Sequence, residues 1–145
     1  MKKIMITIGI IALAALGLYV SSIQNSNDVA GEITIVVVNQ IDEIIIEDTL
    51  AFEESDTLYS VMDENYQLLC ANASYQISDD CENRLFNSKV IMQIESVVTD
   101  WNNNFIAIYV NDVYSNNGID NIPLNDGDII RFEYTLVGEE NTDGN

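Results

Sequence analysis

The segment NFIAIYVNDVYSNNGIDNIPLNDGDIIRFEYTL, residues 104–136, carries the clearest structural pattern in this sequence. Residues 105–110 alternate with period two and are apolar on both faces, which is typical of a strand covered on both sides. Residues 129–136 alternate apolar and polar side chains, which indicates one buried and one solvated face. Between them, the Asn-Asp-Gly-Asp run at 125–128 predicts a tight turn, because these residues tolerate left-handed backbone angles. We therefore expect two strands joined by a long, turn-rich connection.

The first half of the domain predicts a β-hairpin followed by a helix. Residues 33–38 are rich in β-branched side chains and predict the first strand, and residues 44–50 predict the second. Ser55 or Asp56 is expected to cap the helix that follows, with acidic neighbours near the positive end of its dipole. The apolar face of this helix recurs at helical spacing and consists of Leu58, Val61, Met62 and Tyr66.

The remaining segments place the fold in the α+β class. Residues 68–88 show no regular period, whereas residues 90–98 return to strand character, with Met92 and Ile94 alternating against polar neighbours. A hairpin, a helix and further strands in this order predict a β-grasp-like mixed sheet with one helix packed across it. We expect all the strands to join that single sheet.

The N-terminus has the pattern of an export segment. Lys2 and Lys3 precede an apolar run at residues 4–20, which is interpreted either as a cleaved secretory signal peptide or as an uncleaved membrane anchor. In both cases the domain is expected on the extracellular side of the membrane, secreted or anchored. The predicted organisation is a signal or anchor at 1–22, a linker at 23–31, the domain at 32–137 and a disordered acidic tail at 138–145.

The charge of the exported part excludes whole classes of partner. All 24 acidic residues follow Val20, whereas only three of the five basic residues do, namely Arg84, Lys89 and Arg131. Phosphate binding requires the opposite sign, so nucleic acid is excluded as a partner, and anionic lipid headgroups are disfavoured. The acidity is explained either by solubility outside the cell or by capture of a cationic partner.

The two cysteines predict a disulfide. The residue types most often used in catalysis are largely missing from the chain. Cys70 and Cys81 form an even pair in a chain that is expected to be exported, so a disulfide is their simplest role. The sequence contains no His, which removes the commonest general base and the usual partner of a nucleophilic Cys or Ser. We therefore predict that the protein is not an enzyme and that it carries no cofactor.

Acidic side chains and Asn in the loops of residues 104–136 raise the question of calcium, which prefers oxygen ligands. These residues do not have the spacing of an EF-hand, and Asn and Asp are favoured in tight turns by backbone geometry alone. No metal site is predicted. The residues concerned are Asp112, Asn116, Asp120, Asp126 and Asp128.

Four aromatic residues lie close together in the sequence and are the candidate ligand-binding residues. They are Trp101, Phe105, Tyr109 and Tyr114. Phe105 and Tyr109 share one face of the expected strand, so an open face would allow them to stack on a flat ligand or on a partner protein. If the loop between Cys70 and Cys81 covers that face, the same residues belong to the core.

The pattern "YVND…GID…L.DGD.I.F.Y" resembles the transcobalamin-like C-terminal domain family. These are β-grasp-like modules at the vitamin-B12-contacting end of transcobalamin and intrinsic factor, and also standalone bacterial surface domains. The sequence departs from the family at Ile106, where Trp is common, and at Asp112, where Gly is common. The matching positions are Tyr109, Val110, Asn111, Gly118, Ile119, Asp120, Leu124, Asp126, Gly127, Asp128, Phe132 and Tyr134.

The resemblance implies a non-enzymatic extracellular module that caps a corrinoid such as cobalamin, or another small ligand, together with a partner. It adds Asn111 to the candidate ligand-binding residues. In transcobalamin the module works with a separate helical-barrel domain. The alternative is a structural or adhesive cell-surface module that meets another protein and has no small ligand. A concave apolar pocket beside Trp101 and Tyr109 favours the first, whereas a flat or buried face favours the second.

Overall fold

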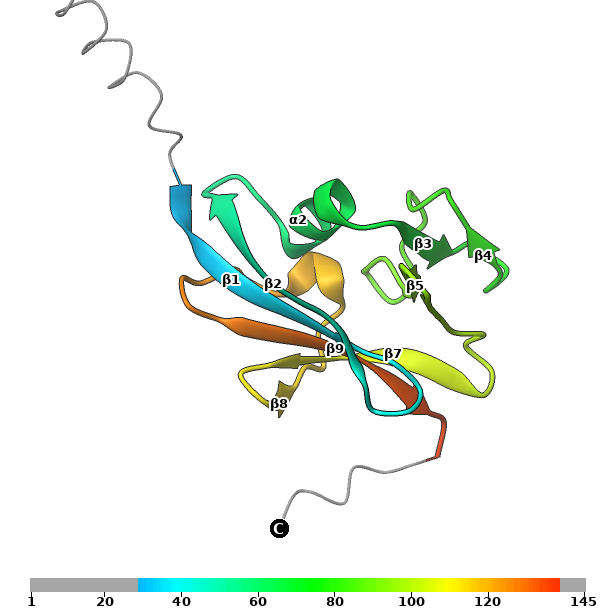
Figure 1. Ribbon diagram of the computed structural model, residues 1–145. Coiled ribbons are helices and arrows are strands. Elements are labelled where there is room, and N and C mark those ends of the chain that lie inside the picture. The colour runs from blue at the N-terminus through cyan, green and yellow to red at the C-terminus, as the bar shows by residue number, and fades with distance from the viewer. Residues whose placement is uncertain (1–28, 139–145) are drawn as a thin grey trace, which may run out of the picture.

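The computed structural model describes residues 29–138, which form two β-sheets and one α-helix (Figure 1). The predicted signal or anchor segment and the tail after Gly138 lie outside the described residues. The first strand begins at Val29, within the segment expected to be a linker. The α+β class predicted from the sequence is confirmed.

The larger sheet has five strands in the order β2-β1-β9-β7-β8. β1 and β9 run parallel at its centre and the other pairs are antiparallel, so the sheet is mixed, as expected. The predicted hairpin and the two strands of residues 104–136 are confirmed, and β1 starts earlier and β2 ends later than expected. The bounds are β1 (Val29–Val38), β2 (Ile44–Glu53), β7 (Asn104–Val110), β8 (Val113–Tyr114) and β9 (Ile129–Leu136).

The other strands form a second, antiparallel sheet, so the expectation of a single sheet was wrong. Its order is β4-β3-β5-β6. Residues 90–98, expected as one strand, form a hairpin because Glu95 turns the chain with a φ of 50°. The irregular segment 68–88 supplies the other two strands. The bounds are β3 (Leu68–Ala71), β4 (Ile77–Ser78), β5 (Ile91–Ile94) and β6 (Val97–Val98).

The helix α2 (Leu58–Asn65) is capped by Thr57 and not by Ser55 or Asp56. Thr57 and Ser60 form a capping box: the Ser60 N–H donates to Thr57 Oγ1 at 3.1 Å, and the Thr57 N–H donates to Ser60 Oγ at 2.9 Å. Asp56 instead accepts the Glu53 N–H at 2.8 Å in the preceding turn. The two residues that were expected to cap therefore lie in the connection between β2 and α2.

One hydrophobic core joins both sheets and the helix. β1 and β9 present Ile33, Ile35 and Phe132 to the same side of the larger sheet, where Leu58 and Met62 of α2 pack against them. Of the predicted apolar helix face, Leu58, Val61 and Met62 are buried. Tyr66 ends the helix in an extended conformation and its hydroxyl donates to Asp48 at 3.0 Å.

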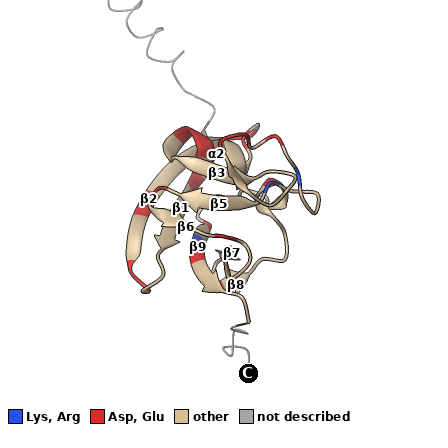
Figure 2. Ribbon diagram, turned by 90° about the vertical axis from the view of Figure 1, so that its right-hand side faces the viewer, with Lys and Arg blue, Asp and Glu red and all other residues tan. Residues whose placement is uncertain are grey.

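The acidic residues gather over β2, the turn that follows it and α2 (Figure 2). The three basic residues of 29–138 all pair with acids: Arg84 and Lys89 with Asp120, and Arg131 with Glu133. Within the described part of the chain, no helix has the length and apolar character needed to cross a membrane.

Candidate functional site

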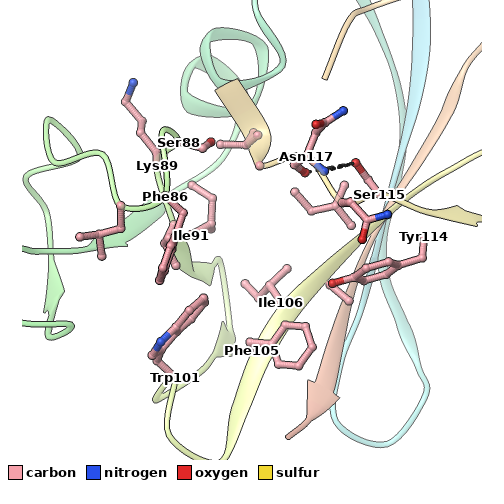
Figure 3. A pocket seen from close by; sticks show the side chains of 17 residues that line it. Phe86, Ser88, Lys89, Ile91, Trp101, Phe105, Ile106, Tyr114, Ser115 and Asn117 are labelled. Atoms are coloured by element: carbon pink, nitrogen blue, oxygen red, sulfur yellow. Dashed lines mark hydrogen bonds between the residues drawn. The ribbon is translucent and has the colours of Figure 1, made fainter. Parts of the chain in front are cut away.

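The candidate site is an open pocket of about 210 Å³ where the edge of the larger sheet meets the loops of the second sheet (Figure 3). Residues 105–108 of β7 form its floor. Residues 85–91 and Trp101 form one wall, and residues 114–119 form the other. The lining is mainly apolar, with polar groups from Ser88, Ser115, Asn116 and Asn117.

A tight turn between β7 and β8 places the second wall. Asn111 and Asp112 both have left-handed backbone angles, with φ of 51° and 65°, as in the two-residue turns that suit a twisted hairpin. The turn brings Tyr114 beside Tyr109, with ring centroids 5.6 Å apart. The Ser115 N–H then donates to the Ile108 carbonyl at 2.8 Å, after which the chain leaves the sheet to form the wall.

The two walls are tied together by Asp120, which lies in the short helix η1 (Ile119–Asn121). Its carboxylate accepts the Lys89 backbone N–H at 2.9 Å and the Lys89 ammonium at 3.2 Å, and its side chain is only 8% exposed. Ser88 Oγ accepts the Asp120 N–H at 3.1 Å. At Gly118 a Cβ would collide with the side chain of Ser88, so the close approach of the walls requires glycine there.

Three aromatic side chains from separate loops, Tyr75, Phe86 and Trp101, form what we call the aromatic wall. Their ring centroids lie 6.2–6.4 Å apart, and Phe86 is 74% exposed. All three have left-handed backbone angles, with φ of 58°, 57° and 63°. Bulky residues rarely adopt this region, and such strain is typically found where function requires it.

Asp100 fixes the loop that presents Trp101. The carboxylate accepts two hydrogen bonds from Asn103, one from its backbone N–H at 2.8 Å and one from its side-chain amide at 2.7 Å. The Asn102 N–H donates a third at 3.0 Å. These hydrogen bonds favour the ionised form and lower the pKa of Asp100 below its ordinary value. The loop therefore depends on a carboxylate at neutral pH.

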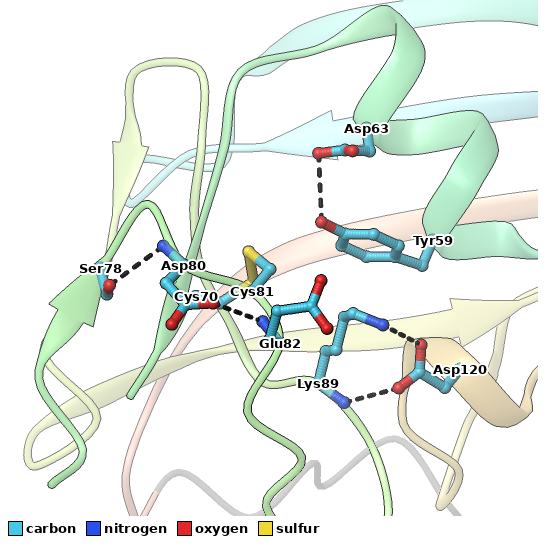
Figure 4. Close-up of a disulfide and its surroundings, with 9 residues drawn as sticks. All are labelled: Tyr59, Asp63, Cys70, Ser78, Asp80, Cys81, Glu82, Lys89 and Asp120. Carbon is cyan, nitrogen blue, oxygen red and sulfur yellow. Dashed lines mark hydrogen bonds and ion pairs between the residues drawn. A yellow bond between two sulfur atoms is a disulfide. The ribbon is translucent and has the colours of Figure 1, made fainter. Parts of the chain in front are cut away.

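The disulfide between Cys70 of β3 and Cys81 is present, as predicted (Figure 4). It fastens the start of the segment that carries Phe86 to the buried strand β3. Beside it, Lys89 lies over the ring of Tyr59, with the ammonium 4.3 Å from the ring centroid. Burial, followed by the charge of Asp63 and its hydrogen bond, raises the pKa of Tyr59 to about 12.

The structure brings together only part of the predicted site. Trp101, Phe105 and Tyr114 line the pocket. Tyr109 does not line the pocket. It is 7% exposed and lies under Arg131, whose guanidinium carbon is 4.4 Å from its ring centroid. That face is therefore covered, although by Arg131 and Tyr114 and not by the disulfide loop.

Asn111 has a structural position outside the pocket. Its side-chain amide donates to Asp128 at 2.8 Å, and its side-chain oxygen accepts the Ile129 N–H at 2.9 Å. These two bonds fasten the hairpin turn to the start of β9. Sequence reasoning missed Tyr75 and Phe86, because the segment 68–88 has no period that would indicate their direction.

The acidic loop residues that raised the question of calcium are engaged elsewhere. Asp126 accepts the Glu32 N–H at 2.9 Å, and Asp128 accepts the amides of Asn111 and Asn125. Asp120 holds Lys89. Within residues 29–138, no three His, Cys, Asp or Glu side chains come together in a group that could hold a metal ion.

A mixed sheet with its first and last strands parallel at the centre, crossed by one helix, defines an α+β, β-grasp-like module. The model of the family described as "Domain of unknown function (DUF4430)" matches residues 55–135, and the chain belongs to this family. Among curated proteins, no sequence matches the chain.

Two of the crystal structures that share this fold are described here by their similarity to the chain. The first is a candidate metal-binding protein from Ruminococcus gnavus ATCC 29149, with a TM-score of 0.52 and 20% identity over 73% of this chain and 97% of that one. The second is haptocorrin in complex with Cbi, with a TM-score of 0.50 and 8% identity over 74% of this chain and 26% of that one. At these identities the likeness concerns the fold alone. The expected relationship to transcobalamin-like domains is therefore supported as a fold relationship, whereas the family shown is DUF4430.

Proposed function

We propose that the protein is an extracellular, non-enzymatic binding module that holds its ligand in the pocket between the two walls. The observation that carries this proposal is the aromatic wall, whose three bulky residues all have left-handed backbone angles. Tyr75 and Phe86 are exposed, Trp101 is half-buried, and Phe86 and Trp101 line the concave apolar site. Exposed aromatic rings lose hydration at little entropic cost when a ligand stacks on them. The disulfide agrees with an oxidising location.

The residues of the pocket support binding more than chemistry. The chain contains no His, and the one cationic side chain at the pocket, Lys89, is held by Asp120 at 3.2 Å. The remaining polar groups are Ser hydroxyls and Asn amides, which can orient a ligand by hydrogen bonds. No pair of contrasting carboxylates lines the pocket, as acid–base catalysis on a glycosidic bond requires.

For the ligand we propose one that is flat and larger than the pocket, and a corrinoid is the example that the sequence resemblance implies. A volume of about 210 Å³ is smaller than the cavities that enclose drug-sized ligands, so the module would cap one side of such a ligand. Haptocorrin, crystallised with Cbi, contains this fold in 26% of its chain. A second chain or domain is accordingly expected to cover the other side.

Metal binding, described for the Ruminococcus gnavus protein, has less support in this chain. The acids near the pocket are committed to Lys89, Arg84 and backbone N–H groups. Calcium therefore serves as a negative control for the corrinoid experiment.

The test is a titration of the oxidised protein with cobinamide and cobalamin, read by melting temperature and calorimetry, with haem and calcium alongside. A ligand of the native state raises the melting temperature as its concentration passes the dissociation constant. We expect a saturable shift with a corrinoid that Trp101→Ala and Phe86→Ala weaken. Ile41→Ala, which removes a 65% exposed apolar side chain from the β1–β2 turn, is the matched control. A shift that Trp101→Ala and Phe86→Ala leave unchanged would contradict the pocket as the site.

A further inference from the structure

The outer edge of β7 is paired over only part of its length. On one side β9 pairs with all of residues 104–110. On the other side β8 pairs only with Tyr109 and Val110, and Ser115 adds one bond to Ile108 before the chain turns away. The position beside residues 104–107 is therefore vacant, and it lies in line with β8.

The backbone of Ile106 points into this vacant position. In an antiparallel pair, successive residues direct their N–H and C=O groups to opposite sides of the strand. The Asn111 N–H bonds to Ile129 at the start of β9, whereas the Ile108 carbonyl accepts from Ser115 on the outer side. Ile106, two residues before Ile108, therefore directs both groups outward. Neither group has a hydrogen-bond partner within residues 29–138.

The surroundings of this edge favour pairing with a single extended peptide over pairing with the strand edge of a second folded protein. An exposed strand edge is a template for pairing with another strand, but here residues 105–108 lie on the floor of the pocket with walls on both sides. A second copy of the protein carries its own β7 edge equally recessed, so the two edges cannot reach each other. A single extended peptide needs only the one strand position that is vacant beside β7.

The aromatic wall and the negative charge of the protein indicate which side chains such a peptide should have. Side chains of an added strand alternate, and those on the core side of the sheet would meet Ile91, Ile119 and the two members of the aromatic wall that line the pocket, Phe86 and Trp101. All three basic residues of 29–138 are already paired, and the chain has a net charge of −19. The exposed carboxylates of Asp100 and Asp112 lie just before and just after β7, so basic residues that flank the bound segment gain from their charge.

We propose that the pocket binds an extended peptide segment of another protein by strand addition to β7. Its backbone pairs with Ile106, apolar residues at alternate positions face the aromatic wall, and Lys or Arg residues flank it. Strand addition obtains affinity from main-chain hydrogen bonds and specificity from alternate side chains. This inference rests on the proposed function, in that the pocket must be a binding site, and it names a peptide of a partner protein as the ligand in place of a flat small molecule.

The test begins with selection from a random heptapeptide phage library on the immobilised oxidised protein. An enriched peptide is then synthesised, and amide hydrogen exchange of the isotopically labelled protein is followed by NMR. We expect the Ile106 amide to exchange at least about tenfold more slowly when the peptide is bound, because strand addition gives it an acceptor. The Ala107 amide, which already faces β9, is the internal control and is expected to stay unchanged.

Two variants separate strand pairing from simple apolar docking. N-methylation of the peptide at the position that pairs with Ile106 keeps its side chains and removes a donor, and is expected to weaken binding about tenfold. Ile106→Pro removes the outward N–H without a bond to β9 and is expected to do the same. The methylated peptide decides the point even if Ile106→Pro does not fold.

The outcomes distinguish this inference from the proposed function. Failure to enrich any peptide, or binding that leaves Ile106 exchange unchanged, would overturn strand addition. If a corrinoid then still binds in a manner sensitive to Trp101→Ala, the module remains a small-ligand binder. If neither peptide nor corrinoid binds, both proposals fail.

Discussion

The left-handed backbone at Phe86 is the residue-scale feature that most clearly points to function. Its φ is 57° and its side chain is 74% exposed, so burial of the ring in the core does not offset the backbone strain. Ordinary side chains in this region of backbone space cost about 1–2 kcal/mol relative to glycine. We interpret the retained aromatic residue as a contribution to binding at the expense of stability.

This interpretation predicts an unusual order of stabilities for two substitutions at Phe86. Phe86→Gly relieves the backbone strain, whereas Phe86→Ala keeps it and loses the ring, so the glycine variant is expected to be more stable than the alanine variant by about 1 kcal/mol. Both are expected to lose ligand binding to a similar degree. Urea unfolding measures the difference, and an alanine variant that equals or exceeds the glycine variant in stability would disprove the strain.

At the scale of elements, the connection between the two pocket walls depends on the buried carboxylate of Asp120. It accepts two hydrogen bonds from Lys89, whose side chain is 14% exposed, and pairs with the more exposed Arg84 at 3.5 Å. Removing one partner of a mostly buried pair leaves the other charge without compensation. The Asp120 interaction is accordingly worth far more than the surface pairs of this protein.

We predict that Asp120→Asn lowers the free energy of unfolding by about 2–4 kcal/mol. Asp112→Asn is the matched control, because Asp112 pairs with Arg131 at 3.9 Å while its side chain is 93% exposed. Its cost is expected to stay below about 0.5 kcal/mol. Chemical denaturation of the two variants tests the prediction, which fails if their costs are equal.

The helix α2 contributes a pH dependence through Tyr59, whose hydroxyl donates to Asp63 at 3.2 Å. Its pKa is raised in the folded state from 10.0 to about 12. Below pH 10 the phenol is neutral in both states and the contribution to stability is complete. As the pH rises from about 10 to about 12, the unfolded tyrosine ionises first and the contribution is lost.

We therefore expect the free energy of unfolding to decrease between about pH 10 and about pH 12, and Tyr59→Phe to make that decrease less steep. Urea unfolding at several alkaline pH values measures it. The ultraviolet absorbance of tyrosinate gives an independent reading. Tyr59 and Tyr66 both have a raised pKa in the folded wild type, so the variant should lack one of the two phenols that ionise late. Identical pH profiles for the two proteins would contradict the assignment.

On the scale of the whole molecule, two sheets and one helix share a single core, and the disulfide attaches the pocket loops to it. Cys70 is fully buried in β3, whereas Cys81 begins the segment that leads to Phe86 and Lys89. The disulfide therefore stabilises the fold and also fixes the position of the segment that carries Phe86 of the aromatic wall.

Loss of the disulfide is expected to cost about 3 kcal/mol, because the bridge restricts a short loop in the unfolded chain. The double variant C70A/C81A and the reduced wild type should show this loss alike, and both should bind ligand more weakly. Reductant is expected to have no further effect on the double variant. Wild-type stability that does not respond to full reduction, verified by intact mass, would refute the prediction.

Four features could be predicted from the order of the amino acids alone: the α+β class, the hairpin of residues 33–50, the strands of residues 104–136 and the disulfide. Each of these leaves a local signal: an alternating period, a turn-forming run or an even pair of cysteines. The acidic surface and the lack of His could likewise be read without a structure.

The division of the strands between two sheets, and the pocket where those sheets meet, became visible in the folded molecule and had no local signal. The same holds for the side chains of the site: Tyr75 and Phe86 join Trp101 in one wall, whereas Asn111 fastens a turn and Tyr109 lies under Arg131. Periodicity reports which face of its own strand a side chain occupies, but not which distant loop meets that face. Left-handed angles at bulky residues run against local preference, so contacts between distant segments, and not the local sequence, must hold them in place.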